Sequence, residues 1–174
     1  LQMLNVYATI ANGGYVMRPY VIREVRDRDG VVIHRTRPEV IGRPITAETA
    51  ALMRALLARV TEDGGTGTRA RVKGFSVAGK TGTAEKVVNG RYSKNHRLTS
   101  FVGAFPMDDP KYVLLAMLDE PKPLPETYGY ATSGWNAVPT AGKIIGRIAP
   151  LLGVTPVFDE DSSGKLEKYK KQRL

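Results

Sequence analysis

The sequence predicts an α+β fold in which an antiparallel sheet packs against helices. The first observation is a series of β-rich runs between residues 75 and 118, with a spacing that suits antiparallel neighbours. The second is the helical spacing of apolar residues over 46–60 and 139–153, each followed by glycine. The strands therefore lie between two helices along the chain.

The composition is that of one ordinary domain or most of one. With 174 residues, of which 42% are hydrophobic, the chain can form a packed core without metal or disulfide support. It has no cysteine, which excludes disulfides and thiolate metal sites, and we predict no metal and no cofactor. The start, Leu1-Gln2-Met3-Leu4, has neither an initiating Met nor a signal pattern. We expect the chain to be part of a longer protein.

The net charge of +9 is interpreted as a solvated surface. Basic residues gather only at 69–73, 91–97 and 165–173, and nowhere do they interleave with aromatic residues. Because single-strand binders need such interleaving, we predict no nucleic acid partner.

The first element is a predicted helix over residues 1–11. Its apolar stripe ends at Asn12-Gly13-Gly14, which tolerates a left-handed cap. Two β-rich runs, 20–25 and 31–34, then flank Asp27-Arg28-Asp29-Gly30, and this pattern predicts a hairpin.

The second predicted helix begins after Thr46, a residue suited to an N-cap. Glu48 complements the dipole of its first turn. The apolar face consists of Leu52, Met53, Leu56, Leu57 and Val60.

Three strands are predicted next, at 75–88, 98–105 and 112–118. Asn89-Gly90 suits a type I′ turn after the first of them. We interpret the basic residues between this turn and Leu98 as a connector.

Three prolines make residues 120–126 a stiff, non-helical surface loop, because each fixes φ and removes a backbone donor. In the last predicted helix, Pro139 lies in the first turn. Gly142 and Gly146 are expected to allow close packing on the sheet. The predicted buried stripe consists of Ile144, Ile145, Ile148, Leu151 and Leu152. Residues 158–174 form a charged tail that we expect to be flexible.

Residues 80–83, Lys-Thr-Gly-Thr, carry the chemistry that we single out. In a strand, Thr81 and Thr83 point to one face, where two hydroxyls can bind the two oxygens of a carboxylate. Lys80 provides positive potential, and Gly82 lets a ligand lie against the backbone and add as a strand. The alternative interpretation is a polar edge or an exposed turn.

This motif, with Val77-Ala78-Gly79 before it, resembles the third motif of penicillin-binding proteins and serine β-lactamases. The surrounding sequence is similar to the division-specific branch of class B penicillin-binding proteins and unlike β-lactamases. The segments that carry this similarity are 7–14 with Arg18-Pro19, 101–106, 118–122 and 128–139.

The resemblance implies a partial transpeptidase fold over residues 1–157, the C-terminal portion of that domain. Three strands of a five-stranded antiparallel sheet would be present, without the upstream strands and the serine-bearing helix. We therefore expect an exposed apolar face and self-association of the chain.

The resemblance also implies the site. Lys80 would lie beside the nucleophilic serine, and Thr81 and Thr83 would hold the carboxylate of a terminal D-alanine or of a penicillin, with Gly82 between them. The Thr83 N–H would form part of an oxyanion hole, so Lys80 and Thr83 are the predicted catalytic residues. Tyr130, in the loop before the last helix, is predicted to contact the substrate, and the alternative interpretation is surface or hinge packing.

The family's first two motifs are absent in the order that the family requires. A serine three residues before a lysine occurs only at Ser162, after the third motif, and Ser93-Lys94-Asn95 also follows it. We expect the nucleophile to lie upstream of Leu1. A serine-histidine-acid triad would need His34 or His96, and neither has a motif around it.

The implied function is that of a peptidoglycan D,D-transpeptidase which crosslinks stem peptides at the septum and binds β-lactams. By resemblance its partners are divisome membrane proteins, and it acts at the periplasmic face of the bacterial inner membrane, held by an upstream anchor. This chain alone is predicted to be inactive. The alternative is a penicillin sensor or a noncatalytic partner-binding module with the same fold.

Overall fold

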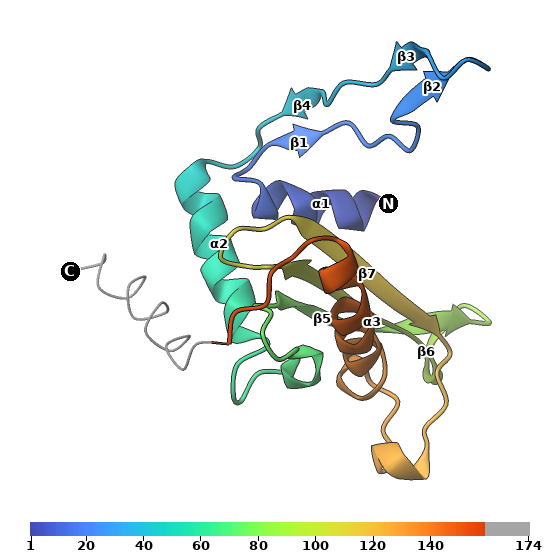
Figure 1. The fold of residues 1–174 in the computed structure, drawn as a ribbon. Helices are drawn as coiled ribbons and strands as arrows, with labels where there is room; N and C mark the ends of the chain where they lie inside the picture. The colour runs from blue at the N-terminus through green and yellow to red at the C-terminus, as the bar shows by residue number, and fades with distance from the viewer. Residues whose placement is uncertain (159–174) are drawn as a thin grey trace.

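The computed structural model describes residues 1–158 and has an α+β fold, as predicted (Figure 1). The flexible tail predicted for residues 158–174 lies outside the described residues, apart from Phe158. No helix among the described residues combines the length and the apolar character needed to cross a bilayer.

The central sheet consists of β5 (Ala78–Val88), β6 (Arg91–Phe105) and β7 (Tyr112–Asp119), antiparallel and in that order. Asn89 at φ 51° and Gly90 at φ 77° form the turn between the first two strands. Positive φ at both positions is what a type I′ turn requires, so this prediction is confirmed.

The connector predicted before Leu98 is wrong, because residues 91–97 belong to β6. Glu85 pairs with Arg97 and Lys86 pairs with Ser93, so residues 94–96 form a bulge in the hairpin. Pairing with β5 overrides the weak strand pattern of this basic segment.

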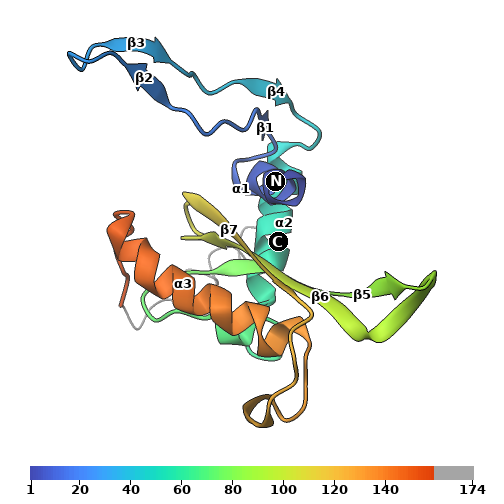
Figure 2. The same cartoon turned by 90° about the vertical axis from the view of Figure 1, so that its right-hand side faces the viewer.

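Helices cover both faces of the sheet. The helix α1 (Gln2–Ala11) contacts β6 and β7 on one face, and α3 (Ala137–Leu151) contacts the same strands on the other (Figures 1 and 2). The main core lies between the sheet and α3, where Phe101, Phe105 and Ile145 are at most 1% exposed.

The buried face of α3 includes Ile145 and Ile148 of the predicted stripe but not its end. Leu151 and Leu152 are 85% and 41% exposed, whereas small residues such as Ala141 and Ala149 are buried. A Cβ on Gly142 would lie 2.9 Å from the carbonyl oxygen of Arg69. The glycine therefore allows close packing on the 3₁₀ turn η1 (Thr68–Ala70), not on the sheet.

The helix α2 (Ala47–Arg59) begins where its cap predicts, since the Thr46 hydroxyl oxygen accepts from the Thr49 backbone N–H at 3.2 Å. Its apolar face is only partly covered: Leu52 and Leu56 are 40% and 55% exposed.

An arm of two ribbons extends beyond α1, away from the sheet (Figure 1). The first ribbon pairs β1 (Val16–Met17) with β4 (Val40–Gly42), and the second pairs β2 (Glu24–Arg26) with β3 (Val32–Arg35). The predicted hairpin is confirmed, but its first strand is shorter than the run 20–25.

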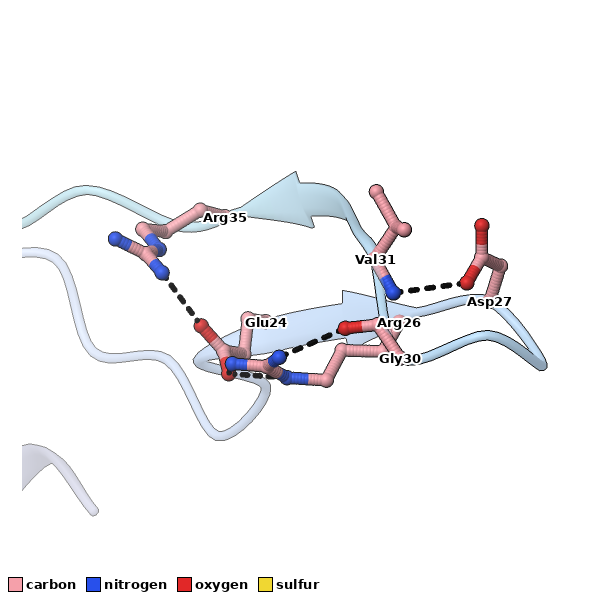
Figure 3. A network of polar contacts seen from close by, with 6 residues as sticks. All are labelled: Glu24, Arg26, Asp27, Gly30, Val31 and Arg35. Atoms are coloured by element: carbon pink, nitrogen blue, oxygen red, sulfur yellow. Dashed lines mark hydrogen bonds and ion pairs between the residues drawn. The ribbon is translucent and has the colours of Figure 1, made fainter.

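Polar contacts stabilise the tip of this arm (Figure 3). Glu24 pairs with Arg26 of the same strand at 2.6 Å and with Arg35 across the ribbon at 3.0 Å. The Asp27 carboxylate accepts from the Val31 backbone N–H at 2.9 Å, and Gly30 takes φ 81° as its turn requires.

The proline loop is exposed as predicted, but it is not wholly non-helical. Its end forms the 3₁₀ turn η2 (Pro125–Thr127), in which Pro125 supplies the fixed φ of a first helical position. A further 3₁₀ turn, η3 (Ser133–Trp135), leads into α3.

Candidate active site

The Lys-Thr-Gly-Thr motif lies on β5, at an edge of the described sheet. Within residues 1–158 this strand pairs only with β6, so its other edge is open. An edge of this kind has unpaired backbone groups that can bind an extended ligand.

The register of the sheet separates the motif into two faces. Thr81 and Thr83 lie opposite Phe101 and Thr99, the residues of β6 that face α3. Since cross-strand partners share a face, both threonine side chains lie on the α3 side and Lys80 lies on the other. The predicted alternation is confirmed.

The Thr83 hydroxyl is fixed by η3. Its oxygen accepts a hydrogen bond from the Ser133 backbone N–H at 3.0 Å, and the Ser133 hydroxyl donates to the Ser100 carbonyl oxygen at 2.6 Å. Because the Thr83 oxygen acts as an acceptor here, its own hydrogen remains available for a ligand. The Thr83 residue is exposed.

Thr81 and Lys80 are also engaged locally. The Thr81 hydroxyl lies 3.0 Å from the Thr66 hydroxyl, and because one hydrogen bridges the two oxygens, one further hydroxyl hydrogen stays free. The Lys80 ammonium donates to the Thr81 carbonyl oxygen at 2.7 Å and is solvent-exposed. A positive charge thus lies beside the strand edge.

Gly82 lies opposite Ser100, and a Cβ on it would be 2.5 Å from the Ser100 hydroxyl oxygen. The absence of a side chain at Gly82 therefore leaves room for the Ser100 hydroxyl. This is a second reason for glycine, besides the close approach of a ligand that the sequence predicts.

Tyr130 belongs to an aromatic cluster. Its ring stacks on Trp135 at a centroid distance of 5.4 Å and an angle of 15°, and Tyr128 meets Trp135 edge-on at 5.4 Å. Tyr130 is 55% exposed. Its contact with substrate stays a prediction.

The start of α3 is tied to the sheet by Asn136. Its side-chain oxygen accepts from the Ala137 N–H at 2.6 Å and from the buried Thr99 hydroxyl at 2.8 Å. Sequence reasoning missed this contact, although asparagine just before a helix is an N-cap signal. It also missed Thr66 and Ser133, and no local signal marks either of them.

The two histidines lie apart from the motif in sequence. His34 is on the arm, and His96 is in the hairpin bulge, where its Nδ1 lies 2.9 Å from the Ser93 hydroxyl. Ser93 pairs with Lys86, beyond the motif on β5. This contact between Ser93 and His96 was not predicted.

Together, the fold and the site define an α+β domain with an open edge strand that displays hydroxyl donors and a lysine. The chain belongs to the family of the penicillin binding protein transpeptidase domain, whose family model matches residues 1–145.

Curated relatives support this assignment. The chain is 41% identical to the probable peptidoglycan D,D-transpeptidase FtsI of Caulobacter vibrioides over 88% of this chain and 26% of that protein. It is 35% identical to the stage V sporulation protein D of Bacillus subtilis over 90% of this chain and 23% of that protein. The predicted class B, division-type branch is confirmed. The chain spans about a quarter of the length of these relatives.

Solved structures share the fold. Penicillin binding protein 3 from Mycobacterium tuberculosis, complexed with ampicillin, is 32% identical with a TM-score of 0.77 over 91% of this chain and 36% of that chain. The transpeptidase domain of Burkholderia pseudomallei penicillin-binding protein 3 is 32% identical with a TM-score of 0.71 over 89% and 43%.

Proposed function

We propose that this chain forms the carboxylate- and oxyanion-binding part of a peptidoglycan D,D-transpeptidase that crosslinks stem peptides during septal wall synthesis. The observation that carries the proposal is the open β5 edge, where Thr83 has its hydroxyl oxygen fixed by Ser133 and its hydrogen free. The 41% identity to a probable D,D-transpeptidase supports this reaction.

The chemistry is nucleophilic acyl transfer. The free hydroxyl hydrogen of Thr83, together with the one that the Thr66–Thr81 pair leaves free, binds the terminal carboxylate of the stem peptide, and the Lys80 charge favours that anion. The Thr83 backbone N–H faces the developing oxyanion, a type of contact whose removal costs on the order of 3 kcal/mol. β-Lactams that carry a carboxylate are bound by the same groups.

We propose that the nucleophilic serine and its lysine come from the part of the protein upstream of this chain. The sequence supports this, because no Ser-x-x-Lys pattern precedes the Lys-Thr-Gly-Thr motif. An upstream membrane anchor, a periplasmic location and divisome membrane partners belong to the same proposal.

Labelling with a fluorescent penicillin tests the proposal. The longer protein with the upstream half should be labelled covalently, and the 174-residue chain should stay unlabelled. The longer protein with Thr83→Val should label more slowly, whereas Arg91→Ala at the hairpin turn should label normally. Covalent labelling of the short chain would contradict an upstream nucleophile. A crosslinking assay with stem peptides separates a transpeptidase from a penicillin sensor.

A further inference from the structure

Arg69 contacts the turn η3 at two points. Its guanidinium carbon lies 3.4 Å from the centroid of the Trp135 ring, and its Nη1 donates to the Gly134 carbonyl oxygen at 3.3 Å. A guanidinium over an indole face is attracted by the ring's quadrupole. Among residues 1–158, no carboxylate forms an ion pair with Arg69. Its guanidinium group instead contacts Trp135 and Gly134 of η3.

The Trp135 ring is held by its other neighbours as well. Tyr130 stacks nearly parallel to it, at 15°, while Tyr128 packs edge-on at 75°. With Arg69, three side chains therefore restrict the indole. A ring restricted in this way limits the movement of the short turn that carries it.

The turn η3 leads directly to Thr83. Ser133, its first residue, is 1% exposed and is anchored to β6 by its hydroxyl, while its N–H holds the Thr83 hydroxyl oxygen. The contacts thus run from Arg69 through Trp135 and Gly134 to Ser133, and from there to the motif.

The segment that carries Arg69 also reaches the second hydroxyl. Thr66, three residues earlier, contacts Thr81 at 3.0 Å, and its carbonyl oxygen would lie 3.2 Å from a Cβ on Gly134. Residues 66–69 therefore pack against both η3 and the motif. This short segment thus contacts Thr81 directly and Thr83 through η3, and these are the two threonines that we propose bind the carboxylate.

We propose that Arg69 is a positioning residue, which fixes the orientation of the Thr83 hydroxyl through η3 without touching the substrate; this inference rests on the proposed function. With Ser133 occupying a lone pair of the Thr83 oxygen, the hydroxyl hydrogen keeps its direction toward the open edge. Donors that are fixed before the ligand arrives need no reorganisation during the reaction.

The first test measures acylation of the longer protein by benzylpenicillin and by its methyl ester. If Arg69 acts through the carboxylate-binding hydroxyl, Arg69→Ala should lower the acylation rate constant for the free acid about tenfold, or about 1.4 kcal/mol, and that for the ester much less. Arg69→Lys should give an intermediate loss, because it keeps the charge but not the planar stacking group. Arg147→Ala, at an exposed position of α3, is the matched control.

A double variant tests whether the effect passes through Thr83. In a Thr83→Val background, Arg69→Ala should cost less than about twofold, because residues that act through one contact are not additive. Equal losses for acid and ester, no loss in Arg69→Ala, or a full tenfold loss in the Thr83→Val background would each overturn the positioning role.

Trp135 provides a readout that is independent of catalysis, since it is the single tryptophan of the 174-residue chain. In this chain Arg69→Ala should shift the tryptophan emission, and Arg147→Ala should not. An unchanged emission would overturn the contact itself. If the unmodified longer protein is not acylated at all, the proposed function fails and the positioning role with it, whereas the emission shift would still establish the contact.

Discussion

Gly79, directly before the Lys-Thr-Gly-Thr motif, has its α-carbon against the neighbouring strand. A Cβ at this position would clash with the Val102 carbonyl oxygen and would lie 2.6 Å from the Phe101 ring and 3.0 Å from the Gly103 α-carbon. Because two of these contacts are backbone atoms of β6, they cannot move without disturbing the pairing that places the motif.

At this residue scale we predict that Gly79→Ala lowers the free energy of unfolding of the chain by about 1–3 kcal/mol, the range for overpacked sites. Urea denaturation measures the change. Gly42→Ala is the control, because nothing lies within 4 Å of a Cβ there. Equal stability of the two variants would contradict the crowding at Gly79.

At the scale of elements, the start of α3 depends on Asn136, which caps the helix and accepts from Thr99. Asn136→Ala should cost about 1–2 kcal/mol for the cap. The buried Thr99 hydroxyl then keeps only a distant acceptor, the Leu118 oxygen at 3.5 Å, and this adds to the loss. Thr46→Ala removes an exposed cap and its contact with the Thr49 hydroxyl, but leaves no buried hydroxyl without its partner. The helical circular dichroism signal during thermal unfolding should show the larger loss for Asn136→Ala, and an equal loss would contradict the role of Thr99.

Also at this scale, Lys86 joins β5 to the end of β7. It pairs with Asp119 and Glu120, each at 2.9 Å. The hydrogen bonds to Asp119 and then to Glu120 raise the pKa of Lys86, and the bond from Lys86 lowers the pKa of Glu120. The strands are thus connected by an interaction that depends on pH.

The direction of this dependence follows from the two pKa shifts. The lowered pKa of Glu120 stabilises the fold above its unfolded pKa of about 4.3, and this stabilisation is lost as the pH falls through the lower folded pKa. The raised pKa of Lys86 stabilises below about 10.4 and is lost as the pH rises through the higher folded pKa. The pH range in which both groups are charged and stabilise the fold therefore includes neutral pH.

We predict that Lys86→Met lowers the urea midpoint at pH 7 and that this effect becomes smaller at a pH below the folded pKa of Glu120, where the ionic bond to Glu120 is lost. Lys94→Met, in the exposed hairpin bulge, is the control at both pH values. A difference between Lys86→Met and the unmodified chain that is undiminished in acid would show that the Lys86–Glu120 pair is not responsible.

At the scale of the whole molecule, large apolar side chains are exposed on α1 and α2. Met3, Val6 and Leu56 are 58%, 53% and 55% exposed. Exposed apolar side chains on two helices that contact each other promote association. The chain spans about a quarter of the length of its curated relatives, so those proteins contain further segments besides the part that corresponds to these helices.

We therefore predict that the isolated chain self-associates and that Leu56→Glu reduces the association. Light scattering after gel filtration, at increasing concentration, gives the molar mass. Val87→Glu, at a 61% exposed position of the hairpin, should not reduce the association. A monomer at the highest concentration would contradict the prediction.

Features that depend on neighbours along the chain could be predicted from the sequence alone. Thr46 caps a helix because its own hydroxyl reaches the first turn, and Asn89-Gly90 forms its turn because both residues tolerate positive φ. The threonines of the motif share a face because a strand alternates its side chains. The family's motif was recognisable because residues 77–83 are consecutive and similar segments flank them along the chain.

Contacts between residues that are distant in sequence became visible only in the folded chain. Arg69 and Gly134 are 65 residues apart in sequence, and Thr83 and Ser133 are 50 apart. No local pattern encodes such pairs. The buried face of α3 was likewise decided by close packing on η1, which selected small residues over the larger leucines at the helix end. Local patterns predicted that the threonines lie on a strand. The hydrogen bond from Ser133, which is distant in sequence, orients the Thr83 hydroxyl.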